Sequence, residues 1–198
     1  ASEYRYRNPI TDDKTLTVII SQSGETADTL AALKEAKKRG SHTLAIVNVV
    51  GSSIANAADD VIYTWAGPEI AVATTKGYTT QLSVLYLIAV WAARILGTMD
   101  SARVEKIFDD ICRLPELIER VILSEPKIKE MAKHCGDPKS LFFIGRNIDY
   151  AVSLEASLKL KEISYIHSEA YAAGELKHGT ISLIEEGRTV IALAAYEE

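Results

Sequence analysis

The sequence predicts an α/β protein with a doubly wound parallel sheet between layers of helices, and three observations support this. Runs of β-forming residues alternate with helical patterns, as in parallel strands joined by crossover helices. The first of these runs leads directly into a polar turn that opens a helix. Apolar residues make up 47% of the 198 residues, enough for a packed core without disulfides or metals.

Three strands separated by helices are predicted in the first half of the chain. After the polar turn, a helical pattern places Leu30, Leu33 and Ala36 on one side, and Gly40 suits its end. In chain order we expect a strand at residues 16–20, the turn at 21–26, this helix, a strand at 43–49, a short helix opening at 51–53, a strand at 61–64, a loop at 67–75 and a long helix at 76–96.

A second α/β unit is predicted to begin at Ser140. Before it, residues 101–133 form an amphipathic helical stretch that we expect to break at Pro115 and Pro126. In the second unit we expect a strand at 141–144, a turn at 145–147, a helix at 148–163, a polar loop with a short helical turn at 169–179 and a strand at 189–194. The predicted domains are the later part of a first unit (1–99), a helical connection (100–139) and the early part of a second unit (140–198).

The composition argues against several classes of function. Lysine plus arginine number 22 and aspartate plus glutamate 27, and the net charge of −5 is a poor match to nucleic acid. Cys112 and Cys135 lack zinc-site spacing, so we expect reduced packing cysteines in a cytoplasmic protein and no metal site. The apolar run at 81–96 is shorter than the roughly 20 residues of a membrane span. No signal peptide opens the chain. Because it starts at Ala1 without a methionine and stops just after a strand-like run at 188–194, we expect an internal piece of a longer protein.

The polar turn SQSGET at residues 21–26 is the first candidate site. It opens a helix, whose N–H groups and dipole favour a phosphate group. Hydroxyl and amide side chains add neutral donors, and its glycine lets the backbone approach a ligand closely. The turn matches neither the Walker nor the GxGxxG pattern, which argues against nucleoside triphosphates and dinucleotides. A capped turn without a ligand is the alternative, and the residues alone weight the two equally.

The helix at 148–163 carries the second candidate site. Glu155, Lys159 and Glu162 are spaced i, i+4 and i+7, so they share one face and can supply acid and base groups. The alternative is a solvated salt-bridge ladder, which such spacing usually indicates. Three apolar residues favour the functional interpretation, because we expect them to anchor the helix in the core: Leu154, Leu158 and Ile163.

His178 is the third candidate, in a polar loop between two glycines. A neutral imidazole can move protons near pH 7. The alternative is an exposed loop histidine without a role, which is the more common case.

Several strings in these segments resemble the glutamine–fructose-6-phosphate amidotransferase family, also called the glucosamine-6-phosphate synthases. They are SQSGETADT at 21–29, LKLKEISYIH at 158–167, GELKHG at 174–179, ASEYRYR at 1–7 and ATTK at 73–76. The resemblance extends over essentially the whole chain. It implies two partial sugar isomerase (SIS) units, each a flavodoxin-like sandwich, with the active site between them.

The resemblance also implies a reaction, in which fructose 6-phosphate and ammonia from glutamine give glucosamine 6-phosphate without a cofactor. Glu162 is implied as the base that moves a proton between C2 and C1, with Lys159 beside it. His178 is implied to open the sugar ring from the partner subunit of a homodimer. The positions implied to bind the substrate, of which the first four contact its phosphate, are Ser21, Gln22, Ser23, Thr26, Val72 and Glu155.

Parts of the family's proteins lie outside these 198 residues. They are the glutaminase domain, the first strand of the first SIS domain and a C-terminal segment whose lysine reaches the sugar. We therefore expect the chain alone to be incomplete for catalysis. Two alternatives remain, a SIS-type phosphosugar-sensing module and a stand-alone phosphosugar isomerase. A sensor needs the 21–26 turn but neither Glu162 nor His178.

Overall fold

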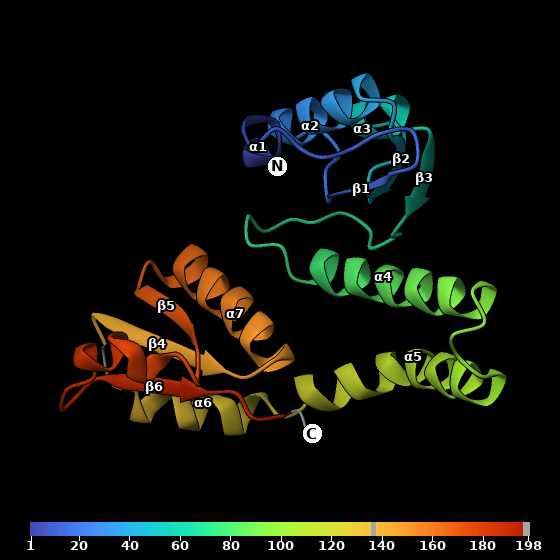
Figure 1. Ribbon diagram of the computed structural model, residues 1–198. Coiled ribbons are helices and arrows are strands. Elements are labelled where there is room, and N and C mark those ends of the chain that lie inside the picture. The colour runs from blue at the N-terminus through green and yellow to red at the C-terminus, as the bar shows by residue number, and fades with distance from the viewer. Residues whose placement is uncertain (136–137, 196–198) are drawn as a thin grey trace. The chain divides into compact units, whose positions relative to one another are not determined.

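The computed structural model describes residues 1–135 and 138–195, and the chain forms two compact units, residues 1–114 and 115–198 (Figure 1). Each unit contains a three-stranded parallel sheet with helical connections. The predicted α/β class with parallel sheets is therefore confirmed. The predicted domain boundaries at residues 99 and 139 stay a prediction.

The first unit is built on the sheet β1-β2-β3, in which all strands run in the same direction. Ser21 pairs with Val47, and Val47 pairs with Tyr63, so the carboxyl ends of the three strands lie level at one edge. The elements that build this unit are α1 (Ser2–Tyr6), β1 (Leu16–Ser21), α2 (Ala27–Lys38), β2 (His42–Val47), α3 (Ser53–Ala57), β3 (Asp60–Tyr63), α4 (Lys76–Ile95) and the larger part of α5 (Ser101–Ile122).

Helices α2 and α3 pack on one face of this sheet (Figure 1). The predicted face of α2 is confirmed, because Leu33 and Ala36 are fully buried. Gly40 has a φ of +89°, the left-handed conformation that commonly follows a helix end. The core between the helices and the strands consists of Ile19, Leu33, Ala45, Val47, Ile54 and Ala55. This core fixes the positions of the turns that leave β1 and β2.

The predicted helix break at Pro115 is wrong, since α5 continues through this residue to Ile122. Proline removes one backbone hydrogen bond and costs about 3 kcal/mol in a helix interior, but a helix can continue through it with a kink. The chain instead leaves the helix at residues 123–124, and Pro126 occupies the first turn of α6 (Glu125–His134), where proline is tolerated. Within residues 1–135 and 138–195, no helix combines the length and apolarity that a membrane span requires.

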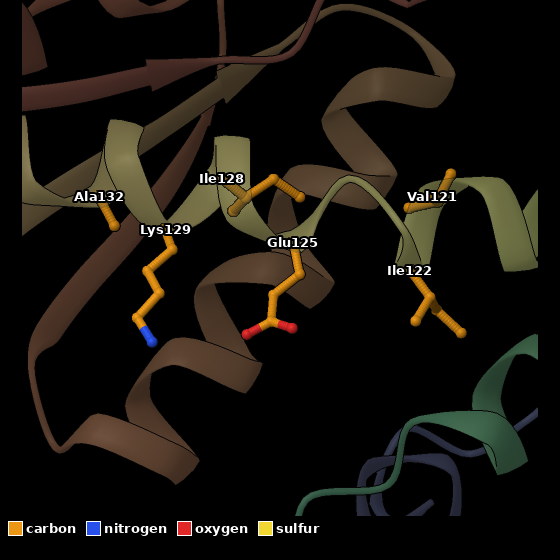
Figure 2. A pocket seen from close by; sticks show the side chains of 6 residues that line it. All are labelled: Val121, Ile122, Glu125, Ile128, Lys129 and Ala132. Atoms are coloured by element: carbon orange, nitrogen blue, oxygen red, sulfur yellow. The ribbon is translucent and has the colours of Figure 1, made fainter.

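The bend between α5 and α6 leaves an apolar hollow of about 580 Å³ (Figure 2). The side chains of Glu125 and Lys129 project from α6 on the same side as that of Ile122 (Figure 2). The hollow is lined by Val121, Ile122, Glu125, Ile128, Lys129 and Ala132. None of the candidate site residues lines it.

The second unit contains the sheet β5-β4-β6, with β4 in the centre and all strands parallel. The predicted loop at residues 169–179 is partly wrong, because its first residues belong to strand β5, although the short helical turn is present at η1. Besides α6, the elements of this unit are β4 (Ser140–Gly145), α7 (Ile148–Ser164), β5 (His167–Ala172), η1 (Leu176–His178), η2 (Thr180–Leu183) and β6 (Thr189–Ala192).

Helix α7 packs on its sheet with hydroxyl side chains, which contradicts the predicted apolar anchor. Leu154, Leu158 and Ile163 are exposed, whereas Ser153 and Ser157 are buried. The Ser157 hydroxyl lies 2.9 Å from the buried hydroxyl of Ser168 on β5. Small side chains let the helix approach the sheet closely, and the paired hydroxyls satisfy each other there. The face of α7 that carries the candidate residues is therefore set by serine packing.

Candidate functional site

The 21–26 turn is held by its own serine hydroxyls. Ser21 ends β1 and is buried, and its hydroxyl oxygen accepts a hydrogen bond from the Gly24 N–H at 3.0 Å. The Ser23 hydroxyl oxygen accepts one from the Glu25 N–H at 3.2 Å. Because both oxygens act as acceptors within the turn, their O–H groups can donate to a ligand.

Thr26 is the N-cap residue of α2, and its side chain makes no capping hydrogen bond. Its carbonyl oxygen accepts from the Leu30 N–H at 2.9 Å, so the helix begins directly after the turn. A helix of 12 residues presents its first N–H groups and the positive end of its dipole here. The turn therefore combines hydroxyl donors with a helix end that favours an anion.

Gln22 faces a hollow of about 470 Å³ at the carboxyl edge of the sheet. Asn48, directly after β2, shapes this hollow. Its side-chain amide donates to the Gly67 carbonyl at 2.7 Å, and its amide oxygen accepts from the Ala66 N–H at 2.8 Å. Sequence reasoning missed Asn48 because the predicted strand at 43–49 included it, whereas β2 ends at Val47. Val72, in the loop before α4, is 96% exposed.

The three charged residues on α7 do lie together, as their spacing predicts. The Lys159 ammonium donates to Glu162 at 2.6 Å and lies 3.5 Å from Glu155. The Lys159 side chain is only 20% exposed. Partial burial lowers the pKa of this ammonium, but the hydrogen bond to Glu162 and the charge of Glu155 outweigh burial and raise the pKa above its usual value. The lysine therefore stays charged, and this geometry suits a salt-bridge network as well as an acid–base site.

His178 ends η1 and is exposed. Its backbone N–H donates to the Glu175 carbonyl at 3.0 Å, and Gly179 follows with a φ of +136°. The part of the chain that the structure describes has no cluster of three or more histidine, cysteine, aspartate or glutamate residues suited to a metal ion. The 21–26 turn and Val72 belong to the first unit, and the α7 residues and His178 belong to the second.

Comparison with known protein families identifies the fold. A family model for the SIS domain matches residues 1–91 and 136–198. The chain belongs to the SIS domain family. Both matched segments contain a parallel sheet. The first includes the 21–26 turn, and the second includes the α7 residues and His178.

Two of the relatives of this SIS chain are glutamine–fructose-6-phosphate aminotransferases [isomerizing]. The protein from Caldanaerobacter subterraneus subsp. tengcongensis is 59% identical over all 198 residues, and that from Clostridium tetani is 58% identical over the same length. In each case the chain spans 33% of the relative, about a third of its length.

Solved structures of other proteins share this fold. The C-terminal domain of glucosamine-fructose-6-phosphate aminotransferase from Francisella tularensis has a TM-score of 0.95 and 37% identity, covering 100% of this SIS chain and 56% of that domain. A glucosamine-6-phosphate deaminase from Thermotoga maritima has a TM-score of 0.76 and 26% identity, with coverages of 96% and 55%.

Proposed function

We propose that the chain is the isomerase portion of a longer enzyme that makes glucosamine 6-phosphate from fructose 6-phosphate and ammonia released from glutamine. The observation that carries the proposal is the Glu155–Lys159–Glu162 group on α7, in a SIS chain 59% identical to an aminotransferase of that name. A proton shuttle on a sugar phosphate needs such a carboxylate, and a phosphate anchor to position the substrate.

In this proposal the 21–26 turn of the first unit binds the substrate's phosphate. The hydroxyls of Ser21, Ser23 and Thr26, the Gln22 amide and the start of α2 supply neutral donors and a positive dipole end. A net charge of −5 supplies no general attraction for an anion, so local donors must do so. Val72 contributes a contact to the sugar.

The proton transfer is assigned to Glu162. Condensation of ammonia at C2 of the ketose releases water, and moving a proton from C1 to C2 then leaves an aldose with an amine at C2. Lys159 donates a hydrogen bond to the Glu162 carboxylate at 2.6 Å and so orients it, and the same ammonium lies 3.5 Å from Glu155. His178 opens the sugar ring, because an imidazole can exchange protons near neutral pH.

The proposal extends to the assembly. A homodimer would supply His178 from the partner subunit, and a glutaminase domain elsewhere in the longer protein would supply ammonia. We further propose a cytoplasmic location, and that the 198 residues alone do not synthesise glucosamine 6-phosphate. A phosphosugar sensor is the rival function, since a sensor needs the turn without the α7 group.

Ser23→Ala in the full-length protein tests the phosphate anchor. A hydrogen bond to a charged group contributes about 1.5–3 kcal/mol, so the Kd for fructose 6-phosphate should rise about 10- to 100-fold. Isothermal calorimetry measures this change. Ser101→Ala, which removes an exposed hydroxyl at the start of α5, is the control and should leave the Kd unchanged. An unchanged Kd for Ser23→Ala would exclude the turn as the anchor.

A further inference from the structure

The Glu25 side chain points from the 21–26 turn to the first residue of α3, where its carboxylate accepts two hydrogen bonds. One oxygen accepts a hydrogen bond from the Ser53 N–H at 2.7 Å, and the other accepts one from the Ser53 hydroxyl at 2.6 Å. Ser53 is the first residue of α3, and Ser52, the N-cap residue, makes no capping bond of its own. Glu25 therefore accepts a hydrogen bond from an N–H group at the start of α3, a role that the side chain of the N-cap residue would normally have.

A second bond joins the same two segments. The Gly24 carbonyl oxygen accepts from the Ile54 N–H at 2.9 Å, so successive residues of the turn bind successive residues of α3. Ile54 is fully buried in the core. The contact is also close, because a Cβ atom at Gly24 would lie 2.1 Å from the Ser52 hydroxyl oxygen. The turn is thus attached to an element that the core holds in place.

The charge of Glu25 makes this pairing relevant to an anionic ligand. A free carboxylate within the turn would repel a phosphate group bound there. Its hydrogen bonds with the Ser53 hydroxyl and N–H lower the pKa of Glu25, so it is ionised and engaged at neutral pH. The carboxylate binds at the N-terminus of α3, so the N–H groups at the N-terminus of α2 stay open to an anionic ligand.

We propose that Glu25 is a positioning residue that holds the 21–26 turn in its phosphate-binding form by capping α3. This inference rests on the proposed function, because it assumes that the turn binds a sugar phosphate. Glu25 itself does not contact the substrate in this account. It acts through the backbone of the turn, where the Gly24 and Glu25 N–H groups order the two serine hydroxyls.

Steady-state kinetics of the full-length protein with fructose 6-phosphate test this role. Glu25→Ala should raise KM at least about tenfold and leave kcat within about threefold, because binding is lost and the α7 chemistry is not. Glu25→Gln should retain most of the affinity, since its amide can accept from the Ser53 N–H and donate to the Ser53 hydroxyl. Glu35→Ala removes a carboxylate paired with Arg39 on α2 and should change neither constant.

Two further measurements separate positioning from general stability. Hydrogen–deuterium exchange at residues 21–26 should become faster in Glu25→Ala, with exchange in the core of β2 unchanged. Adding Ser53→Ala to Glu25→Ala should have a smaller effect on KM than Ser53→Ala has alone, because the shared bond is already gone. Additive effects, an unchanged KM, or equal losses in Glu25→Ala and Glu25→Gln would overturn the positioning role. If the wild-type protein binds no sugar phosphate, the proposed function fails, and this inference fails with it.

Discussion

Glu162→Gln is expected to slow the exchange of substrate protons with solvent by orders of magnitude in the full-length protein while leaving sugar-phosphate binding intact. Glutamine keeps the shape of the side chain and can still accept the Lys159 hydrogen bond, but it cannot take up a proton. Loss of a general base typically slows a reaction by about 10²- to 10⁴-fold. The exchange of hydrogen at C1 of fructose 6-phosphate in ²H₂O, followed by NMR, measures this step directly.

The second unit offers a matched control for Glu162. Glu130 and Lys133 on α6 form an ion pair at 2.7 Å with the same separation of three residues, but both side chains are largely exposed. Glu130→Gln should therefore leave exchange and binding unchanged. If Glu162→Gln also retains wild-type exchange, the α7 group is a salt-bridge network and Glu162 is not the base.

Gly145→Ala is expected to destabilise the second unit strongly. A Cβ atom at this position would lie 2.4 Å from the Asp149 carbonyl carbon and oxygen and 2.6 Å from the Tyr150 nitrogen. These are backbone atoms in the first turn of α7, so the clash can be relieved only by moving the helix away from β4. We expect a loss of about 3 kcal/mol, the upper part of the usual range for overpacking.

Hydrogen–deuterium exchange reports this effect within the second unit. The free energy of local opening, measured at amides in β4 and α7, should fall in Gly145→Ala. The activity that depends on the α7 residues should fall as well. Gly174→Ala is the matched control, because no heavy atom lies within 4 Å of its added Cβ and its backbone is unstrained. Protection in Gly145→Ala equal to that of Gly174→Ala would contradict the close approach of β4 and α7.

The sequence predicted those elements whose signals are local. Helix α2 follows from its apolar spacing and from the glycine at its end, and the 21–26 turn follows from six consecutive residues. Strand β5 was missed because its residues, HSEAYA, show no apolar alternation. Its buried Ser168 is satisfied by Ser157, 11 residues earlier in the chain, and such a pairing is invisible in a local pattern.

The candidate site also has features that local sequence predicts and features that only the packing of distant segments determines. The common face of Glu155, Lys159 and Glu162 follows from helix geometry alone and is confirmed. The bonds from Glu25 to Ser53 join residues 28 positions apart and depend on how α3 packs, so no spacing rule could reveal them. The catalytic and binding roles assigned to the candidate residues, including those of Val72 and His178, stay predictions.

One measurement tests the central claim most directly. The full-length protein is incubated with fructose 6-phosphate in ²H₂O, with and without ammonia, and the sugars are analysed by mass spectrometry and NMR. The isomerase account predicts deuterium in the recovered sugar phosphate, and glucosamine 6-phosphate labelled at C2 when ammonia is present. Binding of fructose 6-phosphate, measured by calorimetry, with neither deuterium incorporation nor amino sugar would contradict the account and identify a phosphosugar sensor.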